Sequence, residues 1–402
     1  MVTEDLIERW RRDTPGCEGR IHLNNAGAAL MPAPVLKAIQ GHLDLEAEIG
    51  GYEAADEAAG RIREVYGLLG RLIGSAPENV AIVENATVAV SQALSAFDLH
   101  PGDVLVTTRH DYTSNQLMYL SLSRRLGIEV LRAEELPEGG ADPESVRRLV
   151  AHPRCRLVCL TWIPTNSGLI QAAEEVGEIC EAAGVPYLVD ACQALGQLPI
   201  DVARLRCDYL AATARKFLRG PRGIGFLYVS ERAIARGDFP LYVDMQGAAL
   251  LDEERFVLAK GAQRFENWEF PYALVLGLGE AARYALEGGI AGIEETGARA
   301  VELAAEVRET VGALPGVRVA DRGARLGAIA TVVVPGQDPK DLVRRLHGAG
   351  VNVYWSLHGE GPRNAPEAGA TPMLRISPHY YNTREEIGRA VAALGDLLGS
   401  GA

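Results

Sequence analysis

Tyr187-Leu188-Val189-Asp190 is followed, 26 residues after its aspartate, by Lys216 at the end of Thr213-Ala214-Arg215-Lys216. Each segment closes a short apolar run, and the turn Gly220-Pro221-Arg222-Gly223 follows the second. Apolar runs of this length, bounded by turn residues, predict buried strands. Because ligands of open α/β sheets bind at the carboxyl ends of the strands, we expect Asp190 and Lys216 to face one site.

An aspartate and a lysine at the ends of two such strands are what pyridoxal 5′-phosphate (PLP) chemistry requires. The lysine amine binds the cofactor as a Schiff base, and the carboxylate keeps the ring nitrogen protonated, so that the ring accepts electrons. An isolated lysine is usually a surface charge, but Lys216 lies between two apolar strands and before a Gly-Pro turn. We therefore predict a PLP enzyme with Lys216 as its catalytic residue and Asp190 as a cofactor ligand.

The rest of the chain predicts an α/β fold whose large domain holds a mostly parallel, seven-stranded sheet covered by helices on both faces. The expected strands are residues 80–83, 104–107, 128–131, 157–162, 186–190, 208–212 and 224–229. After about residue 272 a long helical stretch leads into two or three strands and two helices, which predict a small α/β domain. The expected division is an N-terminal helical segment (1–20) packing with the small domain, a PLP-binding large domain (21–272) and a C-terminal small domain (273–402).

Composition restricts the class of function. The 402 residues carry a formal net charge of −13, which argues against nucleic acid or an anionic membrane as a partner and favours a small-molecule substrate. The acidic N-terminus does not resemble a signal peptide, and no apolar run approaches the roughly 20 residues of a membrane span. We expect a cytoplasmic protein. Its six cysteines form no CxxC pair, so buried, reduced thiols and no metal site are expected.

A further motif points to an anion. Glu84-Asn85-Ala86-Thr87 follows the first strand and opens a helix, so that Ala86 and Thr87 would present backbone N–H groups and a hydroxyl to a phosphate. An ordinary capped helix is the alternative, because asparagine and threonine are common caps.

Six motifs in this order, from about Leu23 to Thr383, resemble the class V aminotransferase and cysteine desulfurase family, which has PLP fold type I (aspartate aminotransferase-like). The resemblance implies that Tyr112 stacks on the PLP ring and that Gln193 and Asn166 approach the ring hydroxyl. It also implies that Thr213 and Arg215 lie in the phosphate-binding segment, with Arg215 where desulfurases commonly have histidine. The alternatives are a packing tyrosine at 112 and a simple turn at Thr165-Asn166-Ser167-Gly168. His110 is off the family register by two residues.

The same resemblance predicts how a substrate is bound. Leu374-Arg375-Ile376-Ser377 and Tyr381-Asn382-Thr383 match the family's Arg-x-Ser and Tyr-Asn-Thr signature. Arg375 is therefore expected to fork onto the substrate α-carboxylate, with a structural ion pair as the alternative. Asn25 and Tyr52 are expected to line the substrate entrance. The family also implies a homodimer in which Phe265–Glu269 completes the partner's site.

Lys216 and Asp190 do not identify the reaction, because they favour formation of a carbanion without determining which product it gives. Desulfurization needs a mobile cysteine on the loop before Arg375, yet no cysteine follows Cys207. The motifs are more similar to the branch of isopenicillin N epimerase-like proteins and cysteine-conjugate C–S lyases of ergothioneine-type and sulfur antibiotic pathways. This favours a C–S lyase that acts on an L-cysteine S-conjugate by β-elimination, with Lys216 removing the Cα proton.

Three alternatives stay open. The first is decarboxylating oxidative deamination of an S-cysteinyl conjugate to an aldehyde, the second is epimerisation or transamination of an amino acid, and the third is a PLP-binding sensor without turnover. The loop from His358 to Thr371 is either a surface loop or a lid over the site.

Overall fold

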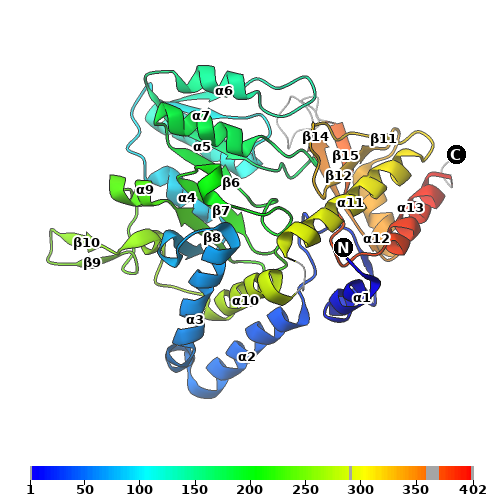
Figure 1. The fold of residues 1–402 in the computed structure, drawn as a ribbon, viewed down its shortest axis with the longest axis horizontal. Coiled ribbons are helices and arrows are strands. Elements are labelled where there is room, and N and C mark those ends of the chain that lie inside the picture. The colour runs from blue at the N-terminus through cyan, green and yellow to red at the C-terminus, as the bar shows by residue number, and fades with distance from the viewer. Residues whose placement is uncertain (1, 289–291, 359–370, 400–402) are drawn as a thin grey trace.

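The structure is a computed structural model that describes residues 2–288, 292–358 and 371–399. Its main element is a seven-stranded sheet, shown in Figure 1, with the spatial order β2-β8-β7-β6-β5-β3-β4. All neighbours in it are parallel except β8, which runs antiparallel to β2 and β7. The seven strands are β2 (Val80–Val83), β3 (Val104–Thr107), β4 (Glu129–Arg132), β5 (Cys155–Thr161), β6 (Tyr187–Asp190), β7 (Tyr209–Thr213) and β8 (Gly225–Val229). The mostly parallel sheet of seven strands is confirmed.

Alternate residues of each strand enter separate hydrophobic cores, as the two-residue period of a strand requires. On β2, Val80 and Ile82 pack into one core with α3, α6, α7, α8 and α10, whereas Ala81 and Val83 pack into the other with α4, α5 and α9. Both faces of the sheet are thus covered. These helices, with α2, are α2 (Ala33–Ile49), α3 (Gly51–Ile73), α4 (Ala86–Ser95), α5 (Thr113–Leu126), α6 (Pro143–Val150), α7 (Ala173–Ala183), α8 (Val202–Leu205), α9 (Glu231–Arg236) and α10 (Tyr272–Arg283).

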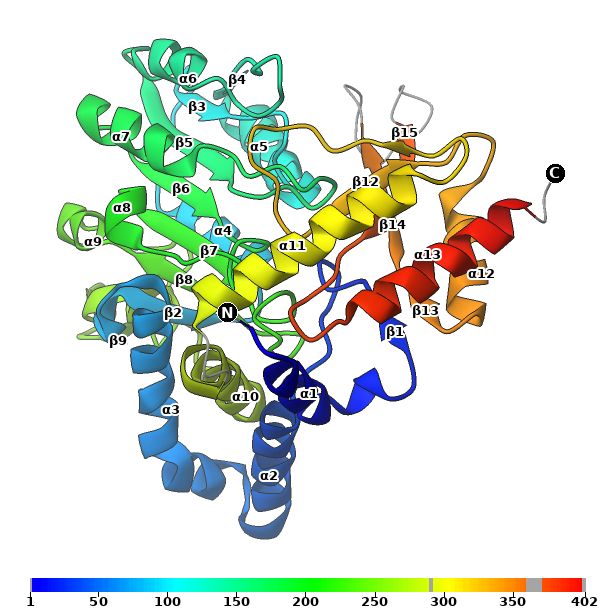
Figure 2. The same ribbon diagram turned by 45° about the vertical axis from the view of Figure 1, so that its right-hand side comes forward.

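A second, smaller α/β unit follows in the chain. Its four-stranded antiparallel sheet has the order β11-β12-β15-β14 and packs against α11 and the helices α12 and α13. Figure 2 shows α11 and α13 running side by side over this sheet. The bounds are α11 (Ile293–Gly312), β11 (Arg318–Val319), β12 (Ala330–Val333), α12 (Pro339–Gly348), β13 (Val351–Asn352), β14 (Tyr354–His358), β15 (Thr371–Ile376) and α13 (Arg384–Gly399).

This unit has more strands than the two or three expected. β13 and β14 follow each other closely in the chain but are separate strands, because they pair with different partners. β13 pairs in parallel with β1 (Ile21–His22) near the N-terminus, whereas β14 pairs antiparallel with β15. The pairing with β1 could not be predicted from sequence periodicity, because it joins residues more than 300 positions apart.

The domain boundaries at residues 20 and 272 stay predictions, and three packing features bear on them. β1 pairs with β13 of the small unit, and α10 packs against α2 and α3, with Val275 and Leu278 in a core of the large sheet. The N-terminal helix α1 (Glu4–Arg12) buries Trp10 in a cluster with Tyr284, Tyr380 and Tyr381. The chain ends are thus tied into both units.

A hairpin lies at the periphery of the large unit. It consists of β9 (Ala248–Leu250) and β10 (Phe256–Leu258) and projects from the large unit in Figure 1. Within the described ranges, no helix combines the length and the apolar character that a membrane crossing needs. Residues 359–370, most of the segment considered as a lid, lie outside the described residues.

Candidate active site

The carboxyl ends of β5, β6 and β7 surround a cavity of about 440 Å³. Lys216 follows β7 by three residues, and Asp190 is the last residue of β6, so that parallel strands bring both to the same edge of the sheet. The residues that line this cavity are Asn85, Ala86, Thr87, Val88, Tyr112, Asn115, Thr161, Ile163, Thr165, Asp190, Cys192, Gln193, Thr213, Arg215 and Lys216. Eight of the residues expected from the sequence to contact the cofactor are therefore brought together: all except Asn166.

Asp190 is buried, and two neutral donors orient its carboxylate. Asn115 Nδ2 donates to Oδ2 at 2.8 Å, and the backbone N–H of Cys192 donates to Oδ1 at 3.0 Å. Asn115 lies in the first turn of α5 and was not predicted as a site residue. Its only signal in the sequence was its place three residues after Tyr112, one helical turn along the same segment.

Lys216 is also buried, and burial lowers the pKa of its amine, with Cys192 and Asp190 acting in the opposite direction. A neutral amine is the form that attacks an aldehyde and that accepts a proton. The Nζ atom lies 5.9 Å from the centre of the Tyr112 ring, which itself lines the cavity. Tyr112 is 37% exposed, so part of this residue faces solvent.

The start of α4 forms an anion-binding corner of the cavity. Asn85 caps the helix by accepting from the backbone N–H of Val88 at 3.0 Å, and Ala86 and Thr87 form the first turn. Gly225 permits this approach, because a Cβ there would lie 2.4 Å from the Ala212 carbonyl oxygen and 3.3 Å from the backbone of Asn85. Free N–H groups and the helix dipole at this corner suit a phosphate.

Gln193 provides an unsatisfied polar atom at the same cavity. Its Nε2 donates to the Ala26 carbonyl at 3.1 Å and to Thr165 Oγ1 at 3.2 Å, whereas the buried Oε1 has no hydrogen-bond partner among the described residues. A buried acceptor without a partner is costly, and a donor on a bound ligand would satisfy it. The cavity thus joins a lysine amine, a carboxylate, an anion corner and an open acceptor, a set that fits PLP.

Arg375 lies beside the cavity without lining it. Its Nη1 donates to the carbonyl and hydroxyl oxygens of Thr165 at 2.8 and 3.0 Å, and its Nη2 donates to Asn24 Oδ1 at 3.1 Å. Burial lowers the pKa of its guanidinium to about 10, and Nε has no partner among the described atoms. No described carboxylate pairs with Arg375, so its charge is held by the neutral oxygens of Thr165 and Asn24.

Three residues expected at the site are placed elsewhere by the structure. Asn166 is buried and donates from Nδ2 to the Leu357 carbonyl at 2.8 Å, which ties it to β14. The amide of Asn25 is fully used, since it donates to the carbonyls of Ser377 and His22 and accepts from the Tyr381 hydroxyl. Its neighbour Asn24, not Asn25, contacts Arg375. Tyr52 is 77% exposed and lines a separate cavity of about 530 Å³.

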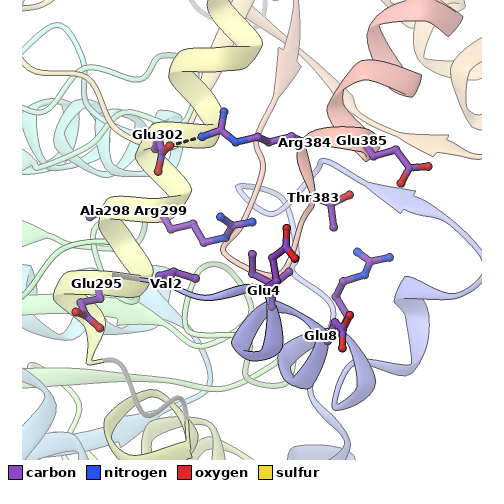
Figure 3. A pocket seen from close by; sticks show the side chains of 12 residues that line it. Val2, Glu4, Glu8, Glu295, Ala298, Arg299, Glu302, Thr383, Arg384 and Glu385 are labelled. Atoms are coloured by element: carbon purple, nitrogen blue, oxygen red, sulfur yellow. Dashed lines mark hydrogen bonds and ion pairs between the residues drawn. The ribbon is translucent and has the colours of Figure 1, made fainter.

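His110 and a second, larger groove lie outside the candidate active site. His110 lies 3.2 Å from a carboxylate oxygen of Glu135 and does not line the cavity. A larger groove of about 880 Å³, shown in Figure 3, runs between α1, α11 and the start of α13. It is lined mainly by glutamates and arginines such as the paired Glu302 and Arg384, and it holds none of the residues expected to bind the cofactor.

Comparison with known proteins identifies the family. The sequence profile of the family described as Aminotransferase class-V matches residues 21–389. The chain is 29% identical to a probable cysteine desulfurase of Methanothermobacter thermautotrophicus, over 100% of this chain and 99% of that protein. It is also 29% identical to isopenicillin N epimerase of Streptomyces clavuligerus, over 94% and 95% of the two chains.

Solved structures of the cystine C–S lyase C-DES share the fold. One has glycine covalently linked to its PLP cofactor, with a TM-score of 0.85, 22% identity and coverage of 96% and 99% of the two chains. The other is a complex with the reaction product cysteine persulfide, with a TM-score of 0.84, 22% identity and coverage of 95% and 99%. The chain therefore belongs to the class V aminotransferase family, has PLP fold type I, and uses pyridoxal 5′-phosphate as its cofactor.

Proposed function

We propose that this enzyme is a C–S lyase that cleaves an L-cysteine S-conjugate by β-elimination. In this reaction R–S–CH₂–CH(NH₃⁺)–COO⁻ and water yield R–SH, pyruvate and ammonium. The bond between Cα and its hydrogen breaks first, and the bond between Cβ and sulfur follows. No oxidant or second substrate is needed, because water hydrolyses the released enamine.

The residues of the cavity are assigned to these events by their chemistry. Bound PLP supplies an electron sink for the Cα carbanion. Lys216 takes the Cα proton, for which its lowered pKa and buried position suit it. Arg375 orients the substrate through its α-carboxylate, and Asp190 pairs with the ring nitrogen. Tyr112 packs against the cofactor ring, and Ala86, Thr87, Thr213 and Arg215 form the phosphate-binding corner.

The cysteines are the observation that carries the proposal. A desulfurase must transfer sulfur to a cysteine thiolate, but burial raises the pKa of all six thiols, to about 11 for Cys17 and Cys155 and further for the others. Cys192 alone lines the cavity, and there burial and the neighbouring Asp190 both oppose its ionisation. The relatives named as desulfurases therefore share the fold and cofactor, while the sulfur acceptor that desulfurization needs has no candidate here.

The test is product analysis with an L-cysteine S-conjugate that has an aromatic thiol as its leaving group. The proposal predicts equal amounts of free thiol and pyruvate, with no persulfide on the intact protein by mass spectrometry. Lys216→Ala is the control for background cleavage. A persulfide on any cysteine would overturn the proposal in favour of desulfurization. Oxygen consumption with carbon dioxide and an aldehyde would indicate oxidative deamination, and racemised substrate would indicate an epimerase.

The exposed apolar surface supports a second proposal, a homodimer. Leu241, Tyr242, Met245, Leu250 and Leu251 are each at least 60% exposed, and they lie on or just before the projecting β9–β10 hairpin. Large exposed apolar patches mark interfaces. We expect light scattering to give twice the 43.1 kDa chain mass at micromolar concentration, and a monomer would contradict the assignment.

A further inference from the structure

Arg219, three residues after Lys216, has an unusual backbone and an unusual environment. Its φ of 63° lies in the left-handed region, and in the described chain only Arg206 shares this property among non-glycine residues. Such a conformation is unfavourable for a long side chain and persists only where the surroundings determine it. Strain of this kind next to a catalytic lysine calls for an explanation.

The Arg219 side chain is a buried cation held by neutral groups. It is 1% exposed, and it donates from Nε to the Leu30 carbonyl at 2.9 Å, from Nη1 to the Tyr380 hydroxyl at 2.7 Å and from Nη2 to Thr14 Oγ1 at 2.5 Å. Its guanidinium carbon also lies 4.5 Å from the ring centre of Tyr381 and 5.6 Å from that of Tyr284. Within the described ranges, no carboxylate forms an ion pair with it. Burial opposes the charge of Arg219, but the tyrosines around it outweigh burial and raise the pKa of the guanidinium, so the charged form is held in this place.

The backbone of Arg219 belongs to the turn that carries Lys216, while its side chain ties that turn to Leu30, Thr14 and Tyr380. Its own backbone N–H donates to the Lys216 carbonyl at 2.9 Å, and Gly220 N–H donates to the Ala214 carbonyl at 2.9 Å. The next carbonyl, of Phe217, lies 2.9 Å from Nε2 of His379. The backbone around the lysine is therefore held by the turn from Ala214 to Gly220, and the C-terminal segment contacts the same turn at Phe217.

The same C-terminal segment begins at the substrate-binding arginine. His379 and Tyr380 follow Arg375 by four and five residues, so one short stretch links the carboxylate site to Arg219 and Phe217. We propose that Arg219 is a positioning residue that holds the Lys216 amine in its buried place and joins that position to the segment bearing Arg375. This proposal rests on Lys216 as the residue that bonds the cofactor, and it is independent of which reaction follows.

The proposal is tested by cofactor capture in the absence of substrate. Loosening the turn admits water to Lys216, and the pKa of the amine then rises toward its ordinary value, because burial is what lowers it. In Arg219→Lys apoprotein we expect the rate of PLP capture, followed by visible absorbance, to shift its pH midpoint upward by at least about 0.5 units. At neutral pH the neutral amine is scarcer, so capture slows about threefold or more.

Two further variants separate positioning from folding. Tyr380→Phe removes only one hydroxyl contact of Arg219 and should shift the midpoint in the same direction by less. Arg299→Gln is the matched control, since Arg299 on α11, labelled in Figure 3, donates to the carbonyls of Tyr380 and Asn382 at 2.8 and 2.9 Å without contacting the lysine turn. We expect it to lower the melting temperature and leave the midpoint unchanged.

Each outcome decides the proposal. A wild-type midpoint in Arg219→Lys, or an equal shift in Arg299→Gln, would overturn it. If Arg219→Lys does not fold, a shift in Tyr380→Phe supports the proposal and a wild-type midpoint in that variant overturns it. Because no substrate is present, these results do not depend on whether the enzyme proves to be a C–S lyase.

Discussion

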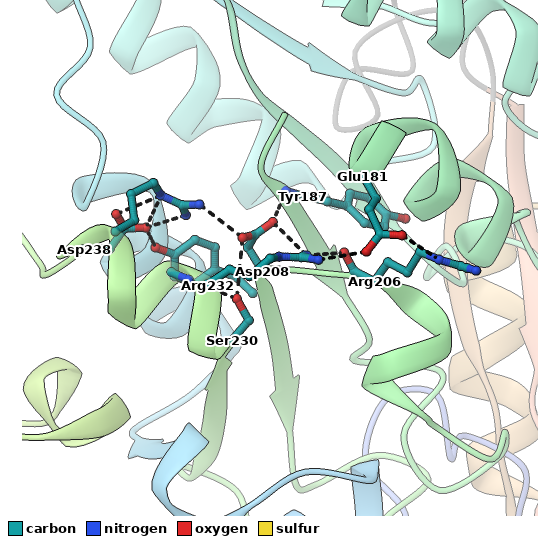
Figure 4. Close-up of polar contacts among 10 residues, drawn as sticks. Glu181, Tyr187, Arg206, Asp208, Ser230, Arg232 and Asp238 are labelled. Carbon is teal, nitrogen blue, oxygen red and sulfur yellow. Dashed lines mark hydrogen bonds and ion pairs between the residues drawn. The ribbon is translucent and has the colours of Figure 1, made fainter. Parts of the chain in front are cut away.

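A buried aspartate lies at each end of β6 and β7, and the two aspartates have different kinds of partner. At the amino end, Asp208 lies 3.5 Å from Arg232 and 3.3 Å from Arg236, and it accepts from the Tyr187 backbone N–H. Figure 4 shows Asp208 between Arg232 and Tyr187. At the carboxyl end, Asp190 has two neutral donors and no cation within ion-pair distance in the described chain. Both aspartates are 3% exposed. Burial alone therefore does not mark a functional carboxylate, whereas an incomplete set of partners facing a cavity does.

The amino-end network extends well beyond one pair. Arg232 also contacts Glu181, which contacts Arg206, and Arg236 also contacts Asp238. Each charged side chain of this network has an oppositely charged neighbour. The network can therefore stabilise the strands, but it offers no unpaired charge to a ligand. At the other end, Gln193 Oε1 and Arg375 Nε have no hydrogen-bond partner in the part of the chain that the structure describes. The following predictions test this contrast.

Lys216→Ala is expected to have the largest effect. Covalent binding of the cofactor should be lost, with the visible absorbance band of the holoenzyme, and turnover should fall by about 10³-fold or more, since proton transfer alone contributes about 10²–10⁴. Circular dichroism should show an intact fold. If the variant keeps the wild-type absorbance band, Lys216 is not the residue that bonds the cofactor.

Asp190→Ala should retain PLP but lose about 10²-fold or more in kcat, about 3 kcal/mol in barrier, because an unpaired ring nitrogen is a poor electron sink. Its free energy of unfolding should change less than its activity. Steady-state kinetics and urea unfolding on the same preparation check both parts. Near-wild-type turnover would show that Asp190 does not act on the cofactor.

Asp208→Ala should lower the free energy of unfolding more than it lowers turnover, the reverse of Asp190→Ala. Removing Asp208 leaves the buried N–H of Tyr187 without its acceptor and takes one of two carboxylates from each of Arg232 and Arg236, and we expect a loss of about 3 kcal/mol in unfolding free energy. The two arginines are 48% and 39% exposed and can regain water, so the loss should fall at the lower end for a broken buried pair. Holoenzyme that does form should turn over at nearly the wild-type rate, and a large fall in kcat would break the contrast between the two ends.

Arg375→Lys is expected to have the smallest effect. A point charge replaces a planar fork, so the substrate carboxylate should bind more weakly by about 1–3 kcal/mol, seen mainly as a raised KM. Arg308→Lys is a suitable control, because Arg308 pairs with Asp321 in the small unit at 2.9 Å and lies outside the cavity. If KM and kcat both stay unchanged, Arg375 is structural.

The sequence predicted what depends on local pattern. The seven strands of the large sheet follow from apolar runs and turn residues, and the resemblance to the family is confirmed by the match over residues 21–389. Positions that depend on the meeting of distant segments were not predictable. Asn24 rather than Asn25 reaches Arg375 because of the backbone register set by the bridge between Asn24 and Ser377. Asn115 and Arg219 were missed because the hydrogen-bond partners of their side chains lie 75 residues away for Asn115 and 161 or more for Arg219.

Mapping the residue that bonds the cofactor tests the central claim most directly. The chain has four lysines, at positions 37, 216, 260 and 340, so reduction of the holoenzyme with borohydride followed by peptide mass spectrometry distinguishes all of them. We expect the added pyridoxyl mass on Lys216 alone. Cofactor mass on Lys37, Lys260 or Lys340 instead, or no trapped cofactor at all in protein that absorbs as a PLP enzyme, would contradict it.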